Sequence, residues 1–438
     1  MSQNDLQHAD PSRENLDGCG EFFLPAGEVF DPRSGLGGNS GDGRNLPCRA
    51  LNFTLRATPK REAPEHEEGE RRDDQRRSDN SRDEYLVFSN PVHLLSMPAP
   101  LSNIRAVEPS FLPTVSEEAH FVDHLEVGAR PHVVVDGPPG PGTVLALSHW
   151  PQARIPPSLS ADSSTGIVAR YLDAAATGPA VEIVTNNHYD EDGTLAIWLL
   201  LNRCGPDDPR RELAIAAAEA GDFRTWTDPA ALQVSIALMR FAERATTPFP
   251  GVLRALSDQS GRNPAGAVIS AVLPRVGSLL SDPDRYQRFW GPSWDHLQPD
   301  LGLVDGGEVR IEEDVSLDLA IVRAPRAIDS LALYRRLTGN RVVTLLAGGE
   351  AWLTYRYESW VTYASRWVAP RVDLTDLADR LQGLETGSAV WRFEGVEAIT
   401  PRLAPFGSRG IVATEIDHDR LVHEFRVALR TAHCTDQR

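Results

Sequence analysis

Residues 187–193 read Asn-His-Tyr-Asp-Glu-Asp-Gly, so one imidazole and two carboxylates stand at alternate positions: His188, Asp190 and Asp192. An extended turn can aim alternate side chains toward one point, and Gly193 permits a tight bend directly after them. Carboxylate oxygens with one imidazole suit Mn²⁺ or Mg²⁺ better than a metal that prefers thiolates. The alternative is a solvated acidic turn that caps a helix, since Asp in a first turn interacts favourably with the helix dipole.

Two more metal-capable residues follow apolar runs earlier in the chain. Asp136 comes directly after Val133-Val134-Val135, and His149 follows the run 144–147 by one residue. Asp136 could equally start a turn through Gly137, and His149 could simply pack beside its neighbours. Taken together with the first segment, they complete a candidate metal set of His188, Asp190, Asp192, Asp136 and His149.

Two other carboxylates are weaker candidates for the same site. Asp162 precedes Ser-Ser-Thr and is best interpreted as the cap of the next helix. Asp222 follows a helical stretch and is a second-rank ligand candidate.

The elements that must position these residues are short apolar runs that alternate with helical segments. Runs 132–135, 143–147 and 181–185 favour strands, and 164–172 and 195–201 have helical spacing. This alternation is typical of a parallel sheet flanked by helices, in which ligands bind at the carboxyl ends of the strands. All three runs end in polar, metal-capable residues, so we expect their ends to meet in one site.

The rest of the chain predicts two folded units behind a disordered N-terminal segment. Between residues 59 and 84, 17 of 26 residues are Lys, Arg, Asp or Glu, which leaves too little apolar surface to form a core. Helices are expected over 211–220 and from Asp228 and Asn263 onward. After residue 300, strands are expected at 307–311, 315–322, 341–346 and 351–357, and helices at 328–337, 373–384 and 418–432. The expected fold class is therefore α/β with these parts: residues 1–84 disordered, 85–300 carrying the metal site, and 301–438 as a smaller α+β domain.

Composition limits the possible partners. The formal net charge is −18, which argues against binding of duplex nucleic acid through a broad basic face. No apolar run approaches the roughly 20 residues that span a bilayer, and no signal peptide is recognisable, so we expect no membrane contact and a cytoplasmic location. Lys60 is the only lysine, so an anionic ligand would have to be held by arginines.

The motifs resemble those of the DHH phosphoesterase superfamily, with their order permuted. His188, Asp190 and Asp192 are similar to its first motif, Asp136 to its second, and Ser148-His149-Trp150 stands where its Asp-His-His motif is expected. The resemblance covers about residues 130–225; the remainder is similar only to uncharacterised bacterial proteins. It implies a DHH-like fold, with Mn²⁺ or Mg²⁺ used to hydrolyse a small phosphorylated or nucleotide-type substrate. Asp190 and His149 would then be the catalytic residues, with His149 either a ligand or a proton donor.

The exchange of Asp-His-His for Ser148-His149-Trp150 supports a second reading. The exchange removes one carboxylate and one imidazole. Such a loss would be expected in a non-catalytic metal- or ligand-binding regulatory protein that retains a degenerate DHH-like fold. In the C-terminal unit, aromatic residues and Arg356, Arg366 or Arg402 could cover the site and hold a substrate phosphate. Their alternative role is structural, as core residues and cross-strand pairs.

Overall fold

The computed structural model describes residues 111–174, 176–258 and 263–435. All of these described residues belong to one compact unit. The predicted disorder of residues 1–84 and the predicted start of the ordered chain near Tyr85 lie outside the described residues.

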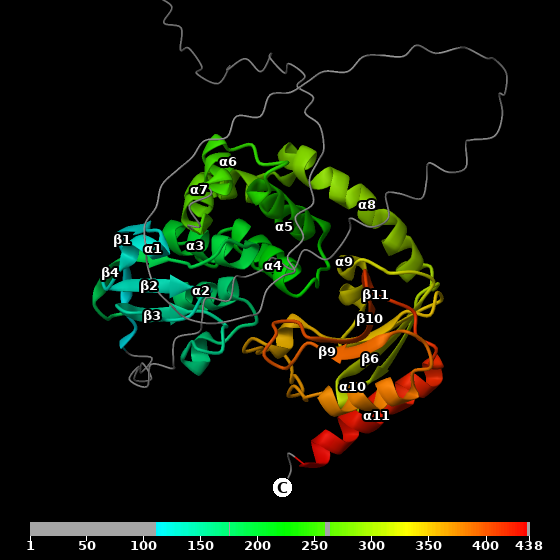
Figure 1. Ribbon diagram of the computed structural model, residues 1–438. Helices are drawn as coiled ribbons and strands as arrows, with labels where there is room; N and C mark the ends of the chain where they lie inside the picture. The colour runs from blue at the N-terminus through cyan, green and yellow to red at the C-terminus, as the bar shows by residue number, and fades with distance from the viewer. Residues whose placement is uncertain (1–110, 175, 259–262, 436–438) are drawn as a thin grey trace, which may run out of the picture. The chain divides into compact units, whose positions relative to one another are not determined.

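Four parallel strands form the first sheet, in the order β1-β4-β2-β3 (Figure 1). They are β1 (Thr114–Phe121), β2 (His132–Val135), β3 (Thr143–Leu147) and β4 (Ala180–Thr185). The three apolar runs are thus adjacent parallel strands, as the sequence predicts, with β2 between β3 and β4. All four residues of β2 are buried, which explains why its sequence is a continuous apolar run rather than an alternating one.

Helices lie between residues 124 and 305, and all of them except the first build the first hydrophobic core together with this sheet. They are α1 (His124–Val127), α2 (Ser164–Asp173), α3 (Glu191–Asn202), α4 (Arg210–Asp222), α5 (Pro229–Ala242), α6 (Pro250–Ser257), α7 (Ala265–Ser281) and α8 (Gln287–Asp305). Side-chain caps start several of them: Ser163 accepts a hydrogen bond at the start of α2, Asp190 at α3 and Asp228 at α5. Asp162 was expected to cap α2, but the next residue, Ser163, does so instead.

The second sheet is mixed and lies in the C-terminal part of the chain. Its strand order is β11-β10-β8-β7-β6-β5, with β9 paired to β10, and only β6 and β7 are parallel neighbours. The strands are β5 (Arg310–Asp314), β6 (Leu319–Ala324), β7 (Arg341–Leu346), β8 (Ala351–Tyr355), β9 (Val390–Phe393), β10 (Arg402–Gly407) and β11 (Gly410–Ile411).

Each face of the second sheet packs into a different core. On one face, Ile321 and Val343 pack with α10 (Thr375–Leu384) and α11 (His418–Thr435), the orange and red helices in Figure 1. On the other face, Val322 and Val342 join the core of the first sheet. The first core therefore continues from the parallel sheet into the C-terminal part of the chain, and α8 runs through residue 300, where the sequence suggested a boundary.

Some sequence expectations need correction in detail. The helix expected over 328–337 is only one turn, α9 (Ser330–Leu333), followed by a 3₁₀ turn. The strand expected from Val315 starts at Leu319, because a 3₁₀ turn comes first and Asp318 takes a left-handed conformation with φ of 50°. No helix among the described residues is long and apolar enough to cross a membrane.

Candidate metal centre

Asp136 lies at the carboxyl end of strand β2 and contacts both histidines of the predicted metal set. This set, which is Asp136, His149, His188, Asp190 and Asp192, is called the cluster below. Its backbone is left-handed, with φ of 45°, a conformation that Asp tolerates better than most residues. The side chain is 1% exposed, and its two oxygens face different histidines: Oδ1 is 3.3 Å from Nε2 of His149, and Oδ2 is 3.2 Å from Nε2 of His188. The Ser164 hydroxyl donates to Oδ1 at 2.9 Å and so fixes the carboxylate.

His149 comes from the end of β3 and is held in a defined tautomer. Its Nδ1 lies 2.7 Å from the backbone oxygen of Asp162, so Nδ1 carries the proton and donates it to that carbonyl. Nε2 lies near three carboxylates, those of Asp136, Asp222 at 3.6 Å and Asp192 at 3.8 Å, and in the neutral ring its lone pair is available to a metal ion. This arrangement is the one usually found behind a metal-binding imidazole.

His188 and Asp190 come from the turn between β4 and α3. Nε2 of His188 is 2.8 Å from Oδ2 of Asp190, while Oδ1 of Asp190 accepts the Gly193 backbone N–H at 2.8 Å. Asp190 is thus the N-cap of α3, as the alternative interpretation of the acidic turn required. Its second oxygen still faces His188, so capping and metal binding are compatible.

Asp192 lies one residue further along α3 and points toward the N-terminus of α2. Its oxygens accept the backbone N–H groups of Ser164 and Thr165, both at 2.7 Å. The carboxylate therefore has a fixed orientation beside His149, and it retains lone pairs for a cation.

The side chains form two groups that could each hold a metal ion and that share Asp136. One group is Asp136, His188 and Asp190; the other is Asp136, His149 and Asp192. The first is partly open, with His188 17% and Asp190 22% exposed, whereas His149 and Asp192 are fully buried. The structure therefore brings all five residues of the predicted metal set together, in one open and one enclosed group.

Asp222, at the end of α4, joins the enclosed group. Its side chain is 8% exposed, and Oδ2 has no hydrogen-bond partner among the described residues. The same is true of Oδ2 of Asp136 and Nε2 of His149. Three buried polar atoms without hydrogen bonds in one place are costly, and a cation between them would remove that cost. The residues present therefore fit a divalent metal.

The pKa shifts in the metal-free cluster also favour a bound cation. Burial raises the pKa of Asp192 to about 6, helped by the charge of Asp136, and burial and the charges of Asp192 and Asp190 raise the pKa of Asp222 well above its usual value. Burial lowers the pKa of His149, but its close contact with the Asp136 carboxylate and the charges of Asp192 and Asp136 outweigh this and raise the pKa to about 8. In the metal-free cluster, bound protons thus neutralise the negative charge that a cation would otherwise neutralise.

A segment from the C-terminal part of the chain covers this site. The backbone N–H of Thr362 donates to the carbonyl oxygen of His149 at 2.7 Å, and Ala364 and Ser365 donate theirs to Oδ1 of Asp162. The Tyr357 ring meets that of His149 edge-on, with centroids 5.8 Å apart. Sequence reasoning expected aromatic residues here to be structural or to cover the site, and they do cover it.

Trp150 also belongs to this aromatic wall. Its ring centroid is 5.3 Å from that of His188 and 4.9 Å from that of Trp360. Ser148, the other departure from Asp-His-His, accepts the backbone N–H of Gly137 and thereby supports the turn after Asp136. Both replacements therefore have structural partners at the edge of the cluster.

The arginines suggested for a substrate phosphate are already paired. Arg356 is 2% exposed and contacts Glu358 at 2.6 Å, and Arg402 pairs with Glu394. Arg366 lies 3.5 Å from Asp318 and its guanidinium covers the ring of Tyr363. These three side chains have partners within the chain, which favours the structural role that the sequence offered as an alternative.

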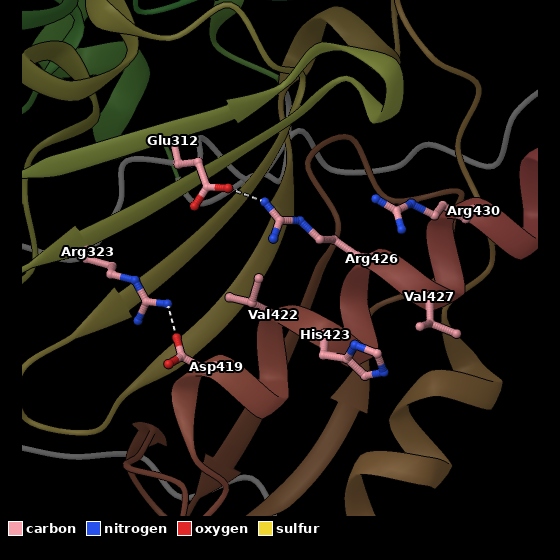
Figure 2. Close-up of a pocket in the computed structure, with 8 residues that line it drawn as sticks. All are labelled: Glu312, Arg323, Asp419, Val422, His423, Arg426, Val427 and Arg430. Atoms are coloured by element: carbon pink, nitrogen blue, oxygen red, sulfur yellow. Dashed lines mark hydrogen bonds and ion pairs between the residues drawn. The ribbon is translucent and has the colours of Figure 1, made fainter.

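A surface hollow of about 430 Å³ lies away from the cluster, between β5, β6 and α11. Figure 2 shows two of its arginines pointing at carboxylates: Arg323 pairs with Asp419, and Arg426 with Glu312. The third, Arg430, lies 3.7 Å from Oδ2 of Asp314. Since these cations are neutralised by their own neighbours, the hollow has no free charge with which to select a ligand.

A family model described as a family of unknown function (DUF6687) matches residues 117–433, a range that contains every residue of the cluster. Neither a curated protein nor a solved structure matches the chain significantly.

Proposed function

This chain belongs to the family DUF6687, and from its paired groups of carboxylates and histidines we propose that it is a divalent-metal-dependent phosphohydrolase. The observation that carries the proposal is the position of Asp136, whose two oxygens face His149 and His188. A carboxylate shared between two ion sites is the arrangement that a two-metal hydrolase requires. The resemblance to the DHH phosphoesterase superfamily stays a prediction, and the convergence of its motif residues supports it.

Mn²⁺ or Mg²⁺ is the proposed metal, because the donor set is rich in carboxylates and contains no thiolate. Bound at this cluster, such ions would lower the pKa of a water molecule and neutralise phosphate oxygens. A substrate would approach from the side of His188 and Asp190, because only this group is open to solvent. The substrate class that fits is a small phosphate ester or anhydride.

His149 is proposed as a ligand rather than as a proton donor. Its Nδ1–H is engaged by the carbonyl of Asp162, and its Nε2 is buried among carboxylates. Asp190 is proposed to orient the reacting group on the open side, since one of its oxygens is fixed by Gly193 and the other faces His188. The Ser164 hydroxyl fixes Asp136 through its hydrogen bond to Oδ1.

The alternative is a metal-binding protein without hydrolytic activity. Packing of Trp150 against His188 favours it, because an apolar ring at that place narrows the access to the open group. Both functions require metal, so only a substrate test distinguishes them.

The test begins with the full chain, freed of metal with EDTA and titrated with Mn²⁺ and with Mg²⁺ by calorimetry. Metal-loaded protein is then assayed with a phosphomonoester, a phosphodiester, a nucleotide and pyrophosphate. We expect metal-dependent release of phosphate or alcohol from at least one of them. Metal binding without turnover of any would support the alternative, and no metal binding would exclude both functions.

Asp136→Asn is the decisive variant, because Asn also tolerates a left-handed backbone and leaves the volume almost unchanged. It should abolish metal-dependent turnover. Asp318→Asn is the matched control, since Asp318 is likewise buried and left-handed, with φ of 50°, but lies outside the cluster. The control should retain both metal binding and turnover.

A further inference from the structure

Arg224 occupies an unusual place two residues after the candidate ligand Asp222. It follows the end of α4 in a left-handed conformation, with φ of 56°, where glycine would be least strained. The residue between them, Phe223, lies beside the cluster, because its ring centroid is 6.1 Å from that of His149. Arg224 is therefore carried on a turn that directly adjoins the enclosed group of ligands.

The charge of Arg224 is not neutralised by a local partner. Among the described residues, no carboxylate forms an ion pair with its guanidinium and no side-chain hydrogen bond fixes it, although the side chain is partly accessible. The end of α4 packs against the start of α3, because a Cβ atom on Gly221 would lie 3.0 Å from Cβ of Glu191. Glu191 stands between Asp190 and Asp192, so the turn that carries Arg224 lies next to the candidate ligands at the start of α3.

The turn that carries Arg224 is held by another arginine, Arg356. Its Nη2 donates to the carbonyl oxygen of Phe223 at 3.2 Å and to the Thr225 hydroxyl at 3.1 Å. These are the residues on either side of Arg224. Arg356 is itself fixed by Glu358, so a buried pair from the C-terminal part of the chain determines how Arg224 is presented.

We infer that Arg224 binds a phosphoryl oxygen of the substrate beside the metal centre. A guanidinium can donate two parallel hydrogen bonds to a phosphate, and an arginine without a carboxylate partner keeps these donors available. Such a cation would offset the negative charge that a phosphorylated substrate brings to a carboxylate-rich site. The inference rests on the proposed function, and it narrows the substrate to compounds whose reacting phosphoryl group keeps at least one oxygen free of the metal ions.

Inorganic phosphate is the probe that separates this inference from the hydrolase proposal. The full chain is loaded with Mn²⁺, and phosphate binding is measured by calorimetry for the wild type, Arg224→Gln and Arg224→Lys. We expect Arg224→Gln to weaken phosphate binding about tenfold or more while Mn²⁺ binding stays unchanged. Arg224→Lys should recover part of the affinity, because lysine restores the charge but not the bidentate geometry.

Arg203→Gln is the matched control. Arg203 also follows a helix in a left-handed conformation, with φ of 52°, but it lies at the end of α3 opposite the candidate ligands, and its side chain donates to the carbonyl of Val115. It should bind phosphate like the wild type. Unchanged phosphate affinity in Arg224→Gln, or loss of Mn²⁺ binding in that variant, would overturn the inference and leave the hydrolase proposal standing. A wild type that binds no Mn²⁺ would overturn both.

Discussion

Nε2 of His149 lies 3.3 Å from Oδ1 of Asp136, and both side chains are almost completely buried. Without a metal ion, this contact is an ion pair inside a site that also contains Asp192 and Asp222. Burial alone would raise the pKa of Asp136, but its close contacts with the imidazoles of His149 and His188 outweigh this and hold the pKa far below its usual range. The metal-free fold therefore depends on bound protons, and a metal ion must displace them.

Metal-free protein should lose stability as the pH rises from about 5 to about 8. The folded state raises the pKa of His149 to about 8 and those of Asp192 and Glu191 to about 6 and 7. A group that binds its proton more tightly when folded stabilises the fold at low pH, and this contribution disappears as the pH passes its folded pKa. Thermal melts in EDTA should therefore show a falling melting temperature.

Mn²⁺ should reverse this trend, because it binds neutral imidazole and ionised carboxylates and stabilises the folded state by mass action. The gain in melting temperature on adding Mn²⁺ should be larger at about pH 8 than at about pH 5.5. A gain that is equal at both values would mean that the ion binds outside the titrating cluster.

Asp190→Asn and Asp192→Asn should remove different metal ions. Asp190 belongs to the open group and Asp192 to the enclosed one, and the two groups share only Asp136. Asn caps a helix about as well as Asp, so Asp190→Asn should leave the metal-free fold intact. Calorimetry should show loss of one class of Mn²⁺ site in each variant, with the tighter site lost in Asp192→Asn.

The wild type is the reference for this pair, and Asp136→Asn should lose both classes of site. If Asp190→Asn binds Mn²⁺ as the wild type does, Asp190 is only a helix cap and the open group is not a metal site.

The adjacency of the three strand ends could be predicted because β2, β3 and β4 are short apolar runs in a parallel sheet. Their carboxyl ends must lie at one edge, so residues 136, 149 and 188–192 come together without any knowledge of long-range packing. The edge strand β1 was missed because its sequence, with Glu117 and Glu118, is polar, and only Val115 in it is buried. Helix α8 was missed because Pro292 and Pro299 suggest helix ends, whereas the structure keeps both inside one helix.

The remaining parts of the site depend on contacts between distant segments. Asp222 ranked low because it ends a helix, and nothing local indicates that this end packs beside His149. Arg356 was a phosphate candidate by residue type, but its partner Glu358 is only two residues away and already offered an internal salt bridge. The docking of Thr362 on His149 spans more than 200 residues and has no local signal.

Gly193→Ala should destabilise the protein, although alanine is the better helix former. A Cβ atom on Gly193 would lie 1.9 Å from Nδ2 of Asn186, a buried side chain whose Oδ1 accepts the backbone N–H of His188. The clash must move either α3 or the turn that presents His188. We expect a loss of about 1–3 kcal/mol in urea denaturation of metal-free protein, together with weaker Mn²⁺ binding.

Gly205→Ala is the control for this substitution, since a Cβ there meets no atom within 4 Å. It should leave both the urea midpoint and Mn²⁺ binding unchanged. Wild-type stability in Gly193→Ala would show that Asn186 is free to move away.

Removing Glu358 alone should cost more stability than removing Glu358 and Arg356 together. Both side chains are 2% exposed, and Nη2 of Arg356 is 2.6 Å from Oε1 of Glu358. Burial raises the pKa of Glu358 even though Arg356 opposes the shift, and Oε2 of Glu358 has no hydrogen-bond partner among the described residues. The pair therefore offsets a large desolvation cost rather than adding much net stability.

Glu358→Leu leaves the Arg356 charge buried without its carboxylate, which should lower the free energy of unfolding by about 3–5 kcal/mol. The double variant Arg356→Met/Glu358→Leu buries no unpaired charge and should lose distinctly less, as measured by urea denaturation of metal-free protein. It should nevertheless weaken phosphate binding to the Mn²⁺-loaded protein, because the turn around Arg224 loses the hydrogen bonds from Arg356. Equal losses of stability in the single and double variants would show that other groups compensate the charge of Arg356. Intact phosphate binding in the double variant would show that the turn around Arg224 holds its shape without Arg356.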